Sequence, residues 1–238
     1  MSLPINVYWS VFCDQELLSR QSLLYGDLEK LIPSMVAESK KSDTYHKCFA
    51  LGALHKNTYF LRHPFDISID FEGKDIQEEF QKSHRDTTIL KIRDPLLHDK
   101  ITFDLDFQII CFADAPLMMH NTPPYMHKTL FSPTAYQSSG AFDVGKWFRP
   151  VSLTYQMFPN EYKVSFKEGE PMCYISFISD KKVNLQRFEM TDKLREVVKG
   201  TTGIKYVKPN ISLNVLYNKF AQAKRKEIVL REIRNNLV

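Results

Sequence analysis

The chain of 238 residues has little of what marks linkers, fibres and membrane proteins. Its eight glycines and twelve prolines are too few for a linker or a collagen-like chain, and 13% aromatic residues argue against disorder. No apolar run approaches the roughly 18 residues of a membrane span. The N-terminus lacks a basic stretch followed by an apolar one, so we expect no secretion signal. These features predict a soluble, globular protein with no membrane partner.

Cysteine is also scarce, and the chemical signatures of common enzymes are missing. Cys13, Cys48, Cys111 and Cys173 are widely spaced and contain no C-x-x-C pair, which excludes the usual zinc sites and a secreted disulfide framework. They are expected to be reduced, mostly buried thiols. The sequence contains no G-x-S-x-G, Walker, G-x-G-x-x-G or H-E-x-x-H motif. It therefore predicts no catalytic residue and no cofactor.

The net charge of +4 is confined to the C-terminal segment. Residues 211–238 hold six basic residues against two acidic ones, so the rest of the chain sums to zero; the basic residues are Lys219, Lys224, Arg225, Lys226, Arg231 and Arg234. Such a segment is a weak electrostatic footprint for nucleic acid. Its apolar residues recur three or four apart, which predicts an amphipathic helix over 210–236 that docks on the domain or on a second subunit.

Alternation of apolar and polar residues predicts strands in the middle of the chain. The predicted strands cover 65–71, 101–109, 151–157, 162–166 and 172–178, with a further strand at 183–188. In 101–109 we expect all five apolar side chains to be buried and Asp104 and Asp106 to face the other way. Because Gly169 lies in the short connection Lys167–Pro171, the strands on either side are predicted to pair as a hairpin.

Helix signals lie at both ends. Leucine spacing predicts helix over 14–38, interrupted at Gly26 and Pro33, and a second helix should begin at the cap Thr191 and end at Gly200. Strands without intervening helices imply a mainly β fold, an antiparallel β-sandwich or jelly-roll-like core with flanking N- and C-terminal helices. We therefore divide one globular unit into an N-terminal helical segment (1–44), an antiparallel β core (45–190) and C-terminal helices (191–238).

Two blocks of sequence carry a resemblance to a known family. The blocks consist of Lys47–Ala50, Lys56–Phe60 and Pro64–Asp66, and of Gly140–Val144, Trp147–Pro150 and Glu168–Pro171. They resemble an uncharacterised family encoded by tailed bacteriophages, many of them marine, and by some bacteria. The resemblance covers roughly 45–190 and implies a phage gene product with a β-rich fold, found in the host cytoplasm or the virion. It implies no catalytic residue.

Histidines supply the metal hypothesis. The tripeptide His84-Arg85-Asp86 with a distant histidine, His127 or His120, has the composition of the facial triad of non-haem iron oxygenases on jelly-roll scaffolds. The predicted iron ligands are His84, Asp86 and His127. The alternative is a solvated, charged loop.

Ligand-binding candidates lie on loops. His120 and His127 flank Pro123-Pro124, and such a fixed loop is the predicted rim of any pocket. Trp147 and Arg149 could stack on a base or a sugar, although core packing with Arg149 paired to Asp143 is the favoured interpretation. Asp66, Asp70, Asp104 and Asp106 could bind a cation, but solvated strand faces explain them more simply.

The leading hypothesis from the sequence is a phage accessory or structural protein without catalysis, built on a binding or self-association module. Its expected partner is a second copy or another phage or host protein, with nucleic acid a weaker candidate. The alternative is an iron-dependent oxygenase-like enzyme on the same scaffold.

Overall fold

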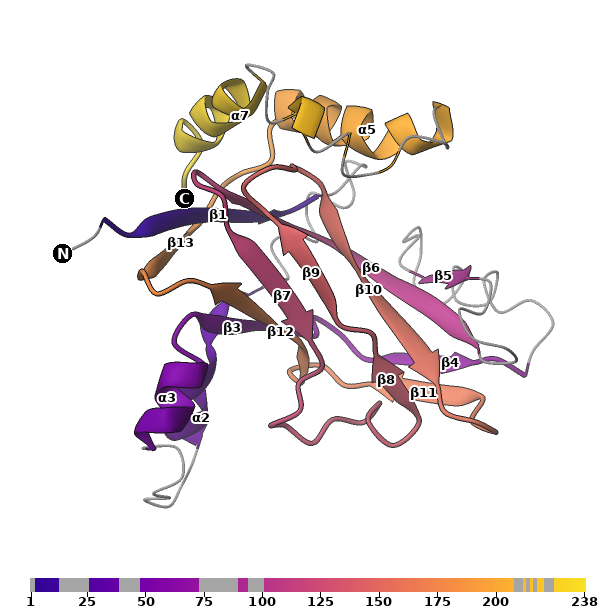
Figure 1. Cartoon of the computed structure of the whole chain (residues 1–238). Helices are drawn as coiled ribbons and strands as arrows, with labels where there is room; N and C mark the ends of the chain where they lie inside the picture. Colours follow the sequence, from indigo (N-terminus) through magenta and orange to yellow (C-terminus); the bar gives the residue numbers. More distant parts are fainter. Residues whose placement is uncertain are drawn as a thin grey trace.

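The computed structural model describes residues 3–12, 26–38, 48–72, 90–93, 101–207, 212, 215, 218–220 and 225–238. Strands account for more of these residues than helices do, and they are arranged in sheets that are almost entirely antiparallel (Figure 1). The mainly β prediction is therefore confirmed.

The first sheet has the strand order β13-β1-β6-β10-β8, with β5 pairing the same edge of β6 as β1. Its strands are β1 (Ile5–Val11), β5 (Leu90–Arg93), β6 (Thr102–Ala113), β8 (Ala135–Gln137), β10 (Pro150–Met157) and β13 (Val183–Arg187). Only the β1–β13 pair is parallel within this sheet. We call it sheet A.

The second sheet, sheet B, has the order β2-β3-β12-β7-β9 and is antiparallel throughout. Its strands are β2 (Glu29–Lys30), β3 (Thr58–Arg62), β7 (Met118–Thr122), β9 (Gly140–Asp143) and β12 (Pro171–Ile178). A separate two-stranded ribbon pairs β4 (Ile67–Asp70) with β11 (Lys163–Phe166).

The predicted hairpin between β11 and β12 is wrong, although both strands exist. Strand β11 pairs with β4 and β12 pairs with β3 and β7, so the connection leads from the ribbon into sheet B. Gly169 has the expected positive φ of 82°, and its N–H donates to the carbonyl of His63 across the bend. Gly169 was recognised correctly as a turn residue. It does not reverse the chain between β11 and β12; it lies where the paired strands β3 and β12 bend and continue as the pair β4 and β11.

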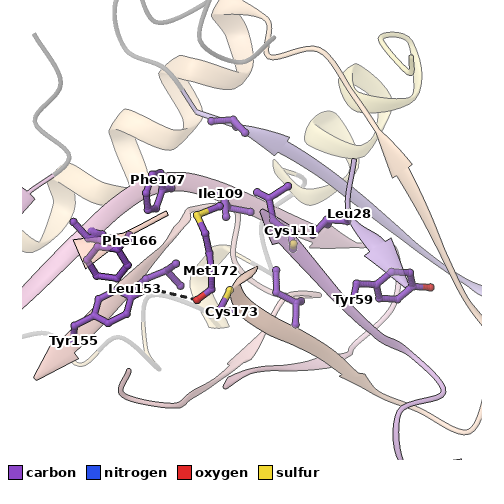
Figure 2. Packing of buried hydrophobic residues seen from close by; sticks show 14 of the residues in the cluster. Leu28, Tyr59, Phe107, Ile109, Cys111, Leu153, Tyr155, Phe166, Met172 and Cys173 are labelled. Carbon is purple, nitrogen blue, oxygen red and sulfur yellow. Dashed lines mark hydrogen bonds between the residues drawn. The ribbon is translucent and has the colours of Figure 1, made fainter. Parts of the chain in front are cut away.

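The main core lies between sheets A and B. Alternate side chains of β1, β6 and β10 meet those of β3, β7 and β12, and the ribbon adds Ile67, Ile69, Val164 and Phe166. Figure 2 shows part of this cluster, with the Tyr155 hydroxyl donating to the carbonyl of Met172. Aromatic rings are packed closely here; those of Phe103 and Tyr155 are stacked with centroids 5.5 Å apart.

The alternation in β6 is confirmed for its apolar residues but not for its acids. Phe103, Leu105, Phe107 and Ile109 are buried, and Ile101 is partly buried against them. Asp104 lies on the opposite face as predicted, yet it is fully buried and accepts a 2.7 Å hydrogen bond from Thr154. The interpretation of Asp104 as a solvated acid is wrong, because its side chain is buried and hydrogen-bonded. The side chain of Asp106 lies outside the described residues.

Helices cover the outer face of sheet A. α5 (Asp192–Val207) and α7 (Arg225–Arg234) lie over this face (Figure 1). Val229, Leu230 and Ile233 of α7 form a second core with Phe112, Phe148 and other residues of the sheet and of α5. Of the helix predicted over 210–236, the part seen as α7 docks on its own domain, while several positions before it lie outside the described residues. Thr191 caps α5 by accepting the N–H of Leu194, but the helix runs past the predicted stop at Gly200.

The N-terminal helical segment predicted over 1–44 is wrong in its first part. Residues Ile5–Val11 are strand β1, between β13 and β6 of sheet A, because their apolar side chains alternate between the two cores. α2 (Leu31–Glu38) is helical as predicted, with Pro33 accommodated in its first turn. α3 (Phe49–Leu54) follows, and both helices lie beside sheet B (Figure 1). None of the helices in the described ranges is long and apolar enough to cross a membrane.

Candidate functional site

The polar groups predicted as a pocket rim gather on the outer face of sheet B. The loop after β7 carries Pro123-Pro124 and returns over Tyr174 of β12, whose hydroxyl accepts the N–H of Met126 at 3.2 Å. That hydroxyl also forms a short hydrogen bond with Nδ1 of His127. In this bond Tyr174 donates to Nδ1 when the His127 proton is on Nε2, and it accepts when that proton is on Nδ1.

Burial controls the protonation of this pair. It raises the pKa of Tyr174 well above its ordinary value, so the hydroxyl stays protonated and remains a donor. It lowers the pKa of His127, with nearby Glu38 opposing and Arg62 reinforcing that shift. At neutral pH, His127 is therefore an uncharged ring that fastens the loop to the sheet.

An ion-pair network borders the pair. Arg62 on β3 contacts the carboxylates of Glu29 at 2.7 Å and of Glu38, and it donates to the carbonyl of Gly169. The hydrogen bond from Arg62 is the main reason that the pKa of Glu29 is lowered. The guanidinium also lies over the Phe60 ring. This network ties the edge strand β2 and the helix α2 to β3 of sheet B, and it leaves Arg62 fully engaged.

α3 adds an apolar surface next to these groups. None of its residues is buried, and Phe49 and Leu54 are 89% and 74% exposed. His55 directly follows the helix, and its Nε2 lies 3.2 Å from the hydroxyl of Tyr125 on the Pro-Pro loop. We call α3 together with Tyr125 the α3 face.

The predicted iron triad is not assembled in the described part of the chain. His84 and Asp86 lie outside the described residues, and Nδ1 of His127 is hydrogen-bonded to the hydroxyl of Tyr174. His120 lies on β7 between Ser176 of β12 and Ala141 of β9. Among the residues that the structure describes, no group of three or more His, Cys, Asp or Glu side chains could hold a metal ion.

The predicted stacking platform is part of the interior. Trp147 is only 5% exposed, so its face cannot receive a base or a sugar, and Arg149 lies over its ring at 5.9 Å. Asp143 pairs with Lys146 at 2.8 Å, not with Arg149 as expected. Of the strand acids, Asp66 and Asp70 are exposed as predicted, and Asp70 pairs with Lys163.

Sequence reasoning missed Tyr174, Tyr125, His55 and the α3 face. Tyr174 was counted as part of an apolar strand. Because side chains alternate along a strand, its place on the outer face of sheet B follows from the inward direction of Cys173 and Ile175. The exposure of Phe49 and Leu54 carries no sequence signal, since an apolar run in a helix predicts burial.

Comparisons of the chain with protein-family models, curated proteins and solved structures found no match.

Proposed function

We propose that this chain is a phage-encoded accessory or structural protein that acts by binding, and that its jelly-roll-like sandwich associates with a second copy through the α3 face. The resemblance of its two sequence blocks supports the phage origin and a place in the host cytoplasm or virion. The exposed apolar residues of α3 carry the proposal of self-association.

The composition of α3 favours a second copy as the occupant. Its sequence FALGAL carries no charge, and the small residues Gly52 and Ala53 lie between Leu51 and Leu54. An added Cβ at Gly52 would meet nothing within 4 Å, so open space lies over this part of the helix. Two α3 helices crossing about a two-fold axis would set the exposed Phe49 and Leu54 of each copy against the open space at Gly52 of the other, without like-charge repulsion.

The available area limits the size of the contact. An exposed aromatic side chain can bury about 150–250 Å², and Tyr125 is 61% exposed beside the helix. Together the α3 face offers on the order of 500 Å² per copy, below the roughly 800 Å² of a standard stable interface. We therefore expect a weak dimer that dissociates on dilution.

Light scattering coupled to size-exclusion chromatography tests the proposal. The wild-type mass should rise toward that of a dimer with concentration. Phe49→Ser with Leu54→Ser should remain monomeric, as should Gly52→Gln, which keeps the apolar ends but fills the open middle. The matched control is Ile228→Ser, which changes a residue 58% exposed on α7, on the helical layer over sheet A; it should dimerise like the wild type. Equal masses for all four proteins would contradict the proposal.

The iron-dependent alternative keeps His84, Asp86 and His127 as its expected ligands. Metal analysis of the purified protein, with His84→Ala as the comparison, tests it directly. Iron retained at one atom per chain and lost in the variant would replace the binding proposal.

A further inference from the structure

His63 lies where the paired chains bend out of sheet B. It follows β3 directly, and its side chain is buried with 2% exposure. Its backbone N–H donates to the carbonyl of Glu170, and its carbonyl accepts the N–H of Gly169, so it holds both chains at the bend. Beyond this point the chains continue as the β4–β11 ribbon, whose apolar side chains close the main core.

The surroundings of the imidazole are apolar. The ring of Phe166 from β11 lies 5.1 Å from it, and that of Phe107 from β6 lies 5.6 Å away, between centroids. Neither ring nitrogen has a hydrogen-bond partner among the described residues. A neutral imidazole fits this place at a modest cost, whereas an imidazolium would be a buried charge between two phenyl rings.

Charged side chains near the bend are directed to other partners. On β3, Arg62 contacts Glu29, Glu38 and the carbonyl of Gly169. On the facing connection, the carboxylate of Glu170 accepts the N–H of Leu130, and Asp66 accepts that of Glu168. From β6 and β11, the groups against His63 are the two phenyl rings. Burial alone accordingly lowers the pKa of His63, to about 3.

We propose that His63 is an acid-sensitive latch: its protonation releases the β4–β11 ribbon from the sandwich and exposes the apolar edge of the main core. Below the ordinary histidine pKa of 6.5, the open form binds a proton that the closed form excludes. The open population therefore grows as the pH falls, approaching tenfold per unit. Between pH 7 and pH 5 it should increase about 25-fold.

Amide hydrogen exchange on the full chain measures this opening. The reporters are the amides of His63, Gly169 and Phe71, which are hydrogen-bonded across the bend and the ribbon. After correction for intrinsic exchange rates, their protection should fall about 25-fold from pH 7 to pH 5. The amides of β1, which is paired on both sides by β13 and β6, should lose less protection. His63→Phe, which keeps an aromatic ring but cannot titrate, should abolish the pH response of the ribbon. His120→Phe removes a half-buried histidine elsewhere and should retain it.

A second measurement does not depend on the stability of any variant. The ring resonances of His63 in the wild-type protein should show no titration between pH 8 and pH 5 in the closed form. A His63 ring that titrates near pH 6.5 without a change in ribbon exchange would overturn the proposal. Equal pH responses in the wild type and in His63→Phe would do the same.

Discussion

Gly145 offers the sharpest test of how the two sheets are joined. A Cβ added there would lie 2.3 Å from the carbonyl oxygen of Ala115 and 2.7 Å from Cα of Pro116. Both are backbone atoms of the β6–β7 connection, so no side-chain rotation can relieve the overlap. The backbone next to Gly145 is held in place at Val144. The N–H of Val144 donates to the carbonyl of Leu117, and its carbonyl accepts the N–H of Ala113, both at 3.0 Å. We expect Gly145→Ala to lower the free energy of unfolding by about 3 kcal/mol, the upper part of the range for overpacked sites.

Urea unfolding followed by fluorescence measures this loss, and two other glycines serve as controls. Gly169→Ala meets no atom within 4 Å but has a φ of 82°, so it should cost about 1–2 kcal/mol from backbone strain alone. Gly52→Ala lies in a helix with open space around it and should gain about 0.5–1 kcal/mol. If Gly145→Ala lost less than Gly169→Ala at unchanged m-value, the close approach of the two connections would be refuted.

Four further outcomes are expected. Phe107→Ala should cost about 3–5 kcal/mol in urea unfolding, since its ring is buried in the main core; a loss below about 1 kcal/mol would contradict that packing. Ile233→Ala in α7 should cost about 2–5 kcal/mol, whereas the exposed Ile228→Ala should change stability by less than about 0.5 kcal/mol; equal losses would mean that the helix docks differently. Thr154→Val removes a hydrogen bond to the buried Asp104 carboxylate and should cost about 1–3 kcal/mol, with no loss if that carboxylate is solvated. Because burial lowers the pKa of His63 from 6.5 to about 3, global stability should fall by up to about 1.4 kcal/mol per pH unit on acidification between those values; a profile that His63→Phe leaves unchanged would assign the effect elsewhere.

Pairing partners explain the largest error in the fold prediction. The residues of β11, Gly169 and β12 were each recognised from local chemistry, yet the hairpin between them does not exist. A glycine with positive φ permits both a reversal and a bend, and the sequence around it is the same in either case. The choice is made by β3 and β4, about a hundred residues earlier in the chain, which offer edges to both strands.

Site residues were harder to predict than strands for a related reason. The Pro-Pro loop was predicted to form a pocket rim with His120 and His127, but His120 lies on β7 and His127 is held by Tyr174, on a strand 47 positions away. Trp147 was considered for ligand stacking, and only the packing of its neighbourhood decided that it is buried. Exposure, which separates a core side chain from a binding one, depends on what else the chain folds over it.

The sequence by itself determined the mainly β class, most of the strands in the middle of the chain and the apolar stripe of the tail helix. These follow from periodicity, because a strand or helix with one buried face must repeat its apolar residues at its own period. Only the tertiary structure decided the strand order, the burial of Asp104 and His63, the docking of the tail on its own sheet and the exposure of α3. Each of these depends on contacts between segments far apart in the chain, and such contacts leave no period in the sequence that encodes them.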